Sequence, residues 1–118
     1  ELFAVGEAES DVSDALKAAI GELEAEDRLI LKLYYFDDLK LKDIAATFGY
    51  HEATASRKLT RVQSEIRKGV EKNLREQHGW SDIEVKKHLS DTAASLGLNL
   101  ETMFAVLMLA IFVQDFWT

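Results

Sequence analysis

Residues 41–59 read LKDIAATFGYHEATASRKL and hold the strongest structural signal in the chain. Apolar residues recur at helical spacing on both sides of Gly49, a residue that can adopt the left-handed conformation that ends a helix. Ile44 and Phe48 give the first segment a face to bury, and Ala45 is small where two helices must cross closely. The pattern predicts a short helix, a tight turn and a second helix, which is the helix-turn-helix arrangement.

The second helix of this arrangement is predicted to continue over about residues 52–76. Its apolar residues repeat every three or four positions, so that one continuous face points inward. This stripe consists of Ala55, Leu59, Val62, Ile66, Val70 and Leu74.

The side chains opposite this stripe could read DNA, because the second helix of a helix-turn-helix enters the major groove. Ala53, Arg57, Thr60 and Ser64 lie on that opposite face, with Ser56 and Arg61 on its two shoulders. Lys58, Arg61, His51 and, in the preceding helix, Lys40 and Lys42 are placed to reach phosphates. The predicted DNA contacts are Lys42, His51, Ala53, Ser56, Arg57, Lys58, Thr60 and Arg61.

Helical periodicity runs nearly from end to end, and the chain of 118 residues contains no proline, so we expect an all-α fold. Further helices are predicted over about residues 11–24, 25–36, 82–96 and 100–116, after a frayed acidic lead-in. Ser81 and Glu84 have the spacing of a capping box, and Asn99 can cap the last helix. We expect a helix-turn-helix domain of four helices over 1–79 and a C-terminal helical hairpin over 80–118.

Charge is divided unevenly along the chain. The net charge is −7, with −8 over residues 1–38, +4 over 39–80 and −3 over 81–118. The acidic average argues against a protein that coats nucleic acid without specificity. The basic middle third indicates one element that faces nucleic acid within an acidic body.

Three motifs extend the pattern: EDRLILKLYYF at 26–36, LKDIA at 41–45 and HEATASRKLTR at 51–61. Their order and spacing resemble region four of sigma-70 family transcription initiation factors, especially the extracytoplasmic-function type. The likeness covers roughly residues 14–76. It implies a cytoplasmic DNA-binding domain that recognises the minus-35 promoter element while docked on the β-subunit flap of RNA polymerase. It also implies that the acidic first third contacts protein, with an anti-sigma regulator as a further candidate partner.

Other chemistry is disfavoured by the pattern. The three His residues share no ligand spacing and the chain has no Cys, so we expect no metal site. Acidic pairs fall at helix ends without a nucleophile or phosphate-binding loop nearby, so we expect no catalytic residues and no cofactor. The competing interpretation is a helical interaction module or regulator that keeps a helix-turn-helix shape without reading DNA. The cluster of Arg57, Lys58 and Arg61 favours DNA.

The final segment carries an apolar run of 11 residues, Met103 to Val113. A membrane span needs about 20, so we place packing within the domain first, association with a partner or a second copy next, and membrane contact last. We predict that the last helix covers Val70 and Leu74 and packs on the preceding helix. That helix offers an inner face of Ile83, Val85, Leu89, Ala93 and Leu96, against Phe104, Leu107, Met108, Ile111 and Phe112 of the last one.

Overall fold

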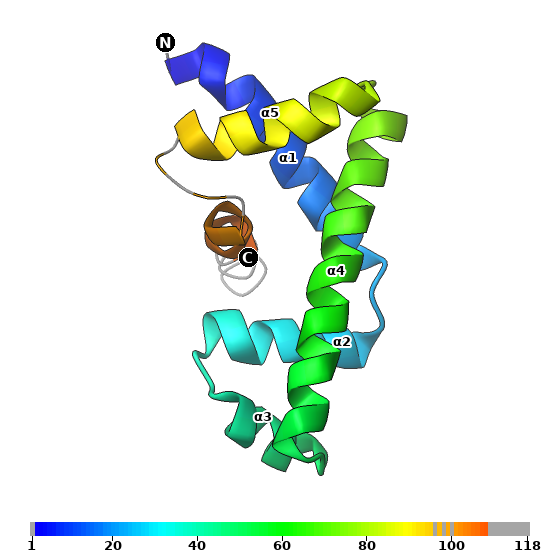
Figure 1. The fold of residues 1–118 in the computed structure, drawn as a ribbon, viewed down its shortest axis with the longest axis vertical. Helices are drawn as coiled ribbons and strands as arrows, with labels where there is room; N and C mark the ends of the chain where they lie inside the picture. The colour runs from blue at the N-terminus through cyan, green and yellow to red at the C-terminus, as the bar shows by residue number, and fades with distance from the viewer. Residues whose placement is uncertain (1, 96, 98, 100, 109–118) are drawn as a thin grey trace, which may run out of the picture.

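The computed structural model describes residues 2–95, 97, 99 and 101–108. Every regular element among these residues is helical, which confirms the all-α prediction (Figure 1). The elements are α1 (Leu2–Gly21), α2 (Ala25–Leu31), the π-helical turn η1 (Lys32–Phe36), α3 (Leu41–Phe48), α4 (Glu52–Gln77) and α5 (Asp82–Ser95), and residues 101–108 are also helical.

The boundaries of α1 differ most from those predicted. The helix begins at Leu2, so the prediction of a frayed lead-in before residue 11 was wrong, and it ends at Gly21, before the predicted residue 24. Apart from one glycine, residues 2–10 contain helix-compatible residues and no proline, so nothing local interrupts the helix.

The long helix α4 is the element on which the others pack. All six residues of its predicted stripe are buried. In Figure 1 α1 crosses behind the C-terminal half of α4, while α2 and α3 lie at its N-terminal end. Buried residues of α1, among them Val12 and Leu16, join the stripe from Leu59 to Leu74 in one core. Periodicity predicts that one face of the first helix points inward, and this is confirmed at Val12, Leu16, Ala19 and Ile20, while Leu23 is partly buried.

Helical periodicity predicts an inner face of Leu29, Leu33 and Phe36 for the helix over 25–36. This prediction was wrong at Leu29, which is 41% exposed. The buried side chains here are Ile30 and Leu31. The reason is the π-helical turn η1, whose wider winding shifts the phase between Phe36 and the preceding residues. A face extrapolated at 3.6 residues per turn from Phe36 therefore misplaces Leu29.

In α5, Val85, Leu89 and Ala93 are buried as predicted. Ile83 is 76% exposed, so its predicted place on the inner face was wrong. It lies two residues before Val85, and two residues turn a helix by more than half a circle, so the two side chains point to opposite sides. Leu96, also predicted for this face, lies outside the described residues.

The helical residues 101–108 bury Met103, Phe104 and Met108. In Figure 1 they are seen end-on between α5 and the cyan end of the α2–η1 segment, so they cross α5 steeply. Leu107 is partly buried against the core, whereas Ile111 and Phe112 lie outside the described residues. Internal packing of the first part of the apolar run is therefore confirmed.

The connection after α4 contacts α1. Asp11 accepts a hydrogen bond from Trp80 Nε1 at 3.1 Å, and its Oδ1 lies 3.2 Å from His78 Nδ1. The predicted boundary between the two domains, after residue 79, lies within this connection. The division at this point stays a prediction.

The predicted capping box at the start of α5 is present. Ser81 N donates to Glu84 Oε1 at 3.0 Å, and Glu84 N donates to Ser81 Oγ at 3.1 Å. The hydrogen bonds from the backbone and side chain of Ser81 lower the pKa of Glu84 below its ordinary value of 4.5. The predicted cap of the last helix is confirmed too, because Thr102 N donates to Asn99 Oδ1 at 2.8 Å.

The capping box of Ser81 and Glu84 predicts that the stability of the fold depends on pH. Because folding lowers the pKa of Glu84, its carboxylate stabilises the fold above pH 4.5, and this contribution is lost as the pH falls further. We expect Glu84→Gln to lose less stability than the wild type between pH 7 and acid, as measured by denaturant unfolding at each pH. Asp91→Asn, an exposed change in the same helix, is the control. Identical acid losses in the wild type and Glu84→Gln would contradict this role.

Candidate nucleic-acid interface

The turn between α3 and α4 has the predicted geometry. Gly49 adopts a left-handed conformation with φ 76°, and Tyr50 N donates to the Ala45 carbonyl at 2.8 Å. This pattern satisfies the last carbonyls of α3 and directs the chain into α4. Ile44 and Leu59, one on each helix, are 1% and 5% exposed. The two helices are therefore held together by buried side chains, as a helix-turn-helix requires.

The structure places the predicted DNA-contacting residues on the solvent side of this unit. The exposed ones are Lys42, His51, Ala53, Arg57, Thr60 and Arg61, while Ser56 and Lys58 are half-buried. Lys40 and Ser64 are exposed as well. The face opposite the buried stripe is therefore available along the first turns of α4. The contacts that these residues make with DNA stay a prediction.

Residues 13–63 match the family model for sigma-70, region 4. No curated protein and no solved structure matches the chain. The match, hereafter the region 4 segment, begins within α1 and ends within α4, and it contains every predicted DNA-contacting residue. It supports a DNA-binding helix-turn-helix of the sigma-factor kind. Helix α5 and residues 101–108 lie outside it.

Within the region 4 segment, the polar side chains at the start of α4 make few interactions with the rest of the protein. Arg57 Nη2 lies 3.4 Å from Thr54 Oγ1, a long contact that leaves most guanidinium donors for a ligand. Lys58 Nζ lies 4.9 Å from the centroid of the Tyr50 ring. Thr60 Oγ1 donates to the Ser56 carbonyl at 3.0 Å, so its oxygen still has lone pairs with which to accept.

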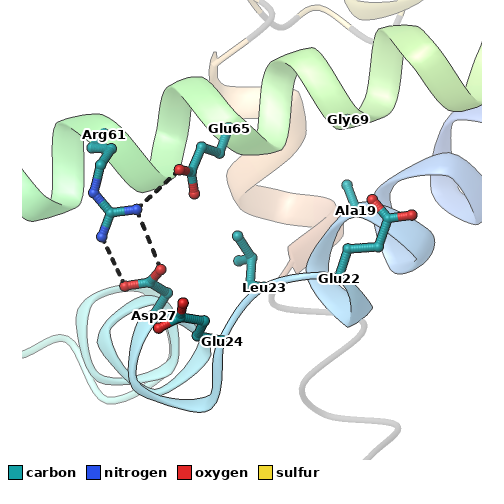
Figure 2. Close-up of a pocket in the computed structure, with 8 residues that line it drawn as sticks. All are labelled: Ala19, Glu22, Leu23, Glu24, Asp27, Arg61, Glu65 and Gly69. Atoms are coloured by element: carbon teal, nitrogen blue, oxygen red, sulfur yellow. Dashed lines mark hydrogen bonds and ion pairs between the residues drawn. The ribbon is translucent and has the colours of Figure 1, made fainter.

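Arg61 is held by the protein itself, as Figure 2 shows. Its guanidinium donates to both carboxylate oxygens of Asp27, at 3.3 and 3.0 Å, and to Glu65 Oε1 at 3.0 Å. The hydrogen bonds to Asp27 and, to a smaller extent, the one to Glu65 raise the pKa of Arg61 above its ordinary value. Sequence reasoning missed the Asp27 pair because it placed Arg61 from the helical wheel alone, and Asp27 is 34 residues away. Glu65, in contrast, is an i,i+4 neighbour of Arg61 on the same helix, and this spacing could have indicated the pair from the sequence. A phosphate contact by Arg61 stays a prediction, and it would compete with these carboxylates.

Tyr50 also makes contacts that sequence reasoning did not predict. Its phenol donates a hydrogen bond to Glu26 in α2, and its ring stacks on Phe48 with centroids 5.8 Å apart. The hydrogen bond to Glu26 raises the pKa of Tyr50 above its ordinary value of 10.0. Tyr50 therefore joins the turn of the region 4 segment to the helix α2 beneath it.

Beyond Thr60, the outward face of α4 meets the C-terminal helical residues. A cavity of about 350 Å³ lies between them. Its lining combines Tyr35, Thr60, Gln63, Ser64, Ile66 and Arg67 with Glu101, Phe104 and Met108. Of the predicted outward-facing residues, Thr60 and Ser64 thus share a cavity with the C-terminal segment. This neighbourhood could not be inferred from periodicity, because it depends on where the last helix docks.

Two further features concern the parts of the chain that the structure describes. No helix there has the length and apolar character needed to cross a membrane. Nor do three or more His, Cys, Asp or Glu side chains gather there into a group that could hold a metal ion.

Proposed function

We propose that this chain is the DNA-binding part of an RNA polymerase sigma factor of the extracytoplasmic-function type, which recognises the minus-35 promoter element during transcription initiation. The observation that carries the proposal is the coincidence of the region 4 match with an exposed polar face on α4, opposite six buried apolar residues. In this role the first turns of α4 would enter the major groove, while α3 would cross the DNA backbone.

The charge distribution supports the choice of partners. The basic residues of the middle third would meet DNA, while the acidic body would face protein, namely the β-subunit flap of RNA polymerase and an anti-sigma regulator. The proposed action is binding in the cytoplasm, with no catalytic step. Base contacts would come from Arg57 and its neighbours on α4, and phosphate contacts from Lys42, His51 and Lys58.

The alternative is a helical interaction module that does not read DNA. The pairing of Arg61 with Asp27 and Glu65 favours it, because this pairing engages one member of the cationic cluster of Arg57, Lys58 and Arg61 that favours DNA. The two functions differ in whether any duplex sequence is preferred by the chain in complex with core RNA polymerase.

The test compares Arg57→Ala with Lys58→Ala on a duplex selected in vitro for binding to this complex. If Arg57 reads a base edge, its loss should cost about 1–3 kcal/mol on the selected duplex and relax preference at one position. Lys58→Ala should weaken all duplexes similarly and reduce the salt slope by about one. Binding is measured by fluorescence anisotropy at several salt concentrations.

The control is Lys86→Ala, which removes an exposed cation from α5, outside the region 4 segment. It should change neither the preference nor, beyond a small uniform effect, the affinity. Equal losses on all sequences from Arg57→Ala and Lys58→Ala would contradict base reading by Arg57. If the wild-type complex prefers no duplex over any other, the interaction module is the better description.

A further inference from the structure

Two adjacent acidic residues at the start of α2 hold two separate points of the helix-turn-helix. Glu26 accepts a hydrogen bond from the Tyr50 phenol, in the turn just before α4. Asp27 accepts the two hydrogen bonds from Arg61, in the third turn of α4. Adjacent residues of a helix point about 100° apart, so one turn of α2 can reach both partners.

The two anchor points are well separated along α4. Arg61 follows Glu52, the first residue of α4, by nine residues, which corresponds to about 14 Å along the helix axis. Tyr50 precedes Glu52 by two residues. The predicted base-reading residues Ala53, Ser56 and Arg57 therefore lie between the anchors.

Each anchor is strengthened by its surroundings. The Asp27 side chain is only 9% exposed, so its charge depends on the paired guanidinium for compensation. The fork of Arg61 meets this carboxylate with two parallel bonds, which fixes an orientation as well as a distance. The Tyr50 ring is packed on Phe48 and faces the Lys58 ammonium group.

We infer that Glu26, Asp27, Tyr50 and Arg61 are positioning residues that fix the tilt of the first turns of α4 for base reading. A single contact would leave α4 free to rock about it, whereas two contacts from one turn of α2 remove that freedom. Base-edge hydrogen bonds require side chains held to a fraction of an ångström, which such supporting contacts provide. This inference rests on the proposed function, because tilt matters only if α4 reads bases.

The experiment uses Tyr50→Phe and Asp27→Asn in the full chain, in complex with core RNA polymerase. Tyr50→Phe keeps the ring but removes the phenol oxygen, and Asp27 is buried and so does not itself contact DNA. The readout is the ratio of affinities for the selected duplex and a shuffled duplex, at a temperature where circular dichroism shows each variant folded. Each change should lower this ratio by about three- to tenfold. The salt slope should stay unchanged in Tyr50→Phe, which keeps every charge.

Tyr35→Phe is the matched control. It removes the phenol that accepts a hydrogen bond from Gln63 at 2.7 Å, another link to α4 that lies beyond the two anchors. A purely structural role would lower thermal stability in all three variants and leave the affinity ratio untouched. If Asp27→Asn does not fold, the affinity ratio of Tyr50→Phe alone tests the inference.

The possible failures can be told apart. An affinity ratio unchanged in a folded Tyr50→Phe overturns the inference and leaves the proposed function intact. A ratio lowered by Arg61→Lys but not by Asp27→Asn also overturns it, because Arg61 then contacts DNA directly. A wild-type complex that shows no sequence preference overturns the proposed function and this inference together.

Discussion

Truncation of Leu59 or Ile44 to alanine is expected to lower the free energy of unfolding by roughly 2–5 kcal/mol. The two side chains are 5% and 1% exposed and lie on the two helices of the motif. Each truncation removes apolar contacts and leaves a cavity that neighbouring helices fill only in part. Since the free energy of unfolding of small domains is only about 5–15 kcal/mol, either change removes a large fraction of the total stability.

Denaturant unfolding followed by far-ultraviolet circular dichroism measures this loss. Ile83→Ala and Leu29→Ala are matched controls, because these side chains are 76% and 41% exposed. We expect Ile83→Ala to change stability by no more than about 0.5 kcal/mol, with Leu29→Ala between it and the core variants. If Leu59→Ala were no more destabilising than Ile83→Ala, the packing of α4 against α3 would have to differ from that described.

Features encoded by neighbouring residues were predictable from the sequence. The stripe of α4 follows from spacing alone, and every one of its six members is buried. The left-handed Gly49 and the capping box at Ser81 are equally local, since each involves residues within one turn. The outward face of α4 was found in the same way, because a residue opposite a buried stripe is usually exposed.

Features that depend on distant residues were not predictable. No residue pattern near Arg61 predicts its pairing with Asp27, and none near Tyr50 predicts its hydrogen bond to Glu26. Such pairs form only when α2 and α4 are brought together. The exposed Leu29 illustrates a different limit. Its place depends on the π-helical winding of Lys32–Phe36, and a search at a fixed helical period assumes that such winding is absent. For the candidate interface, the sequence thus identifies the exposed face but not the contacts that hold it.

The close crossing of α1 and α4 at Gly69 was also not anticipated, and it supports the second large prediction. A Cβ atom at Gly69 would lie 2.9 Å from the Ala19 Cβ and 3.5 Å from its Cα. Neither atom can move without shifting the helix. We therefore expect Gly69→Ala to lower the free energy of unfolding by about 1–3 kcal/mol. This loss outweighs the gain of up to about 1 kcal/mol that alanine brings to a helix interior.

Gly21→Ala is the control, since a Cβ atom there meets nothing within 4 Å, and it should leave stability unchanged or slightly raised. Ala19→Gly reopens the space at the crossing. The double variant Ala19→Gly/Gly69→Ala should therefore be less destabilised than the sum of the two single changes, in a double-mutant cycle measured by thermal and denaturant unfolding. Strict additivity would mean that the two helices are not in contact here. A coupling of the expected sign would show that the crossing fixes the distance between α1 and the helix that carries the proposed DNA-reading face.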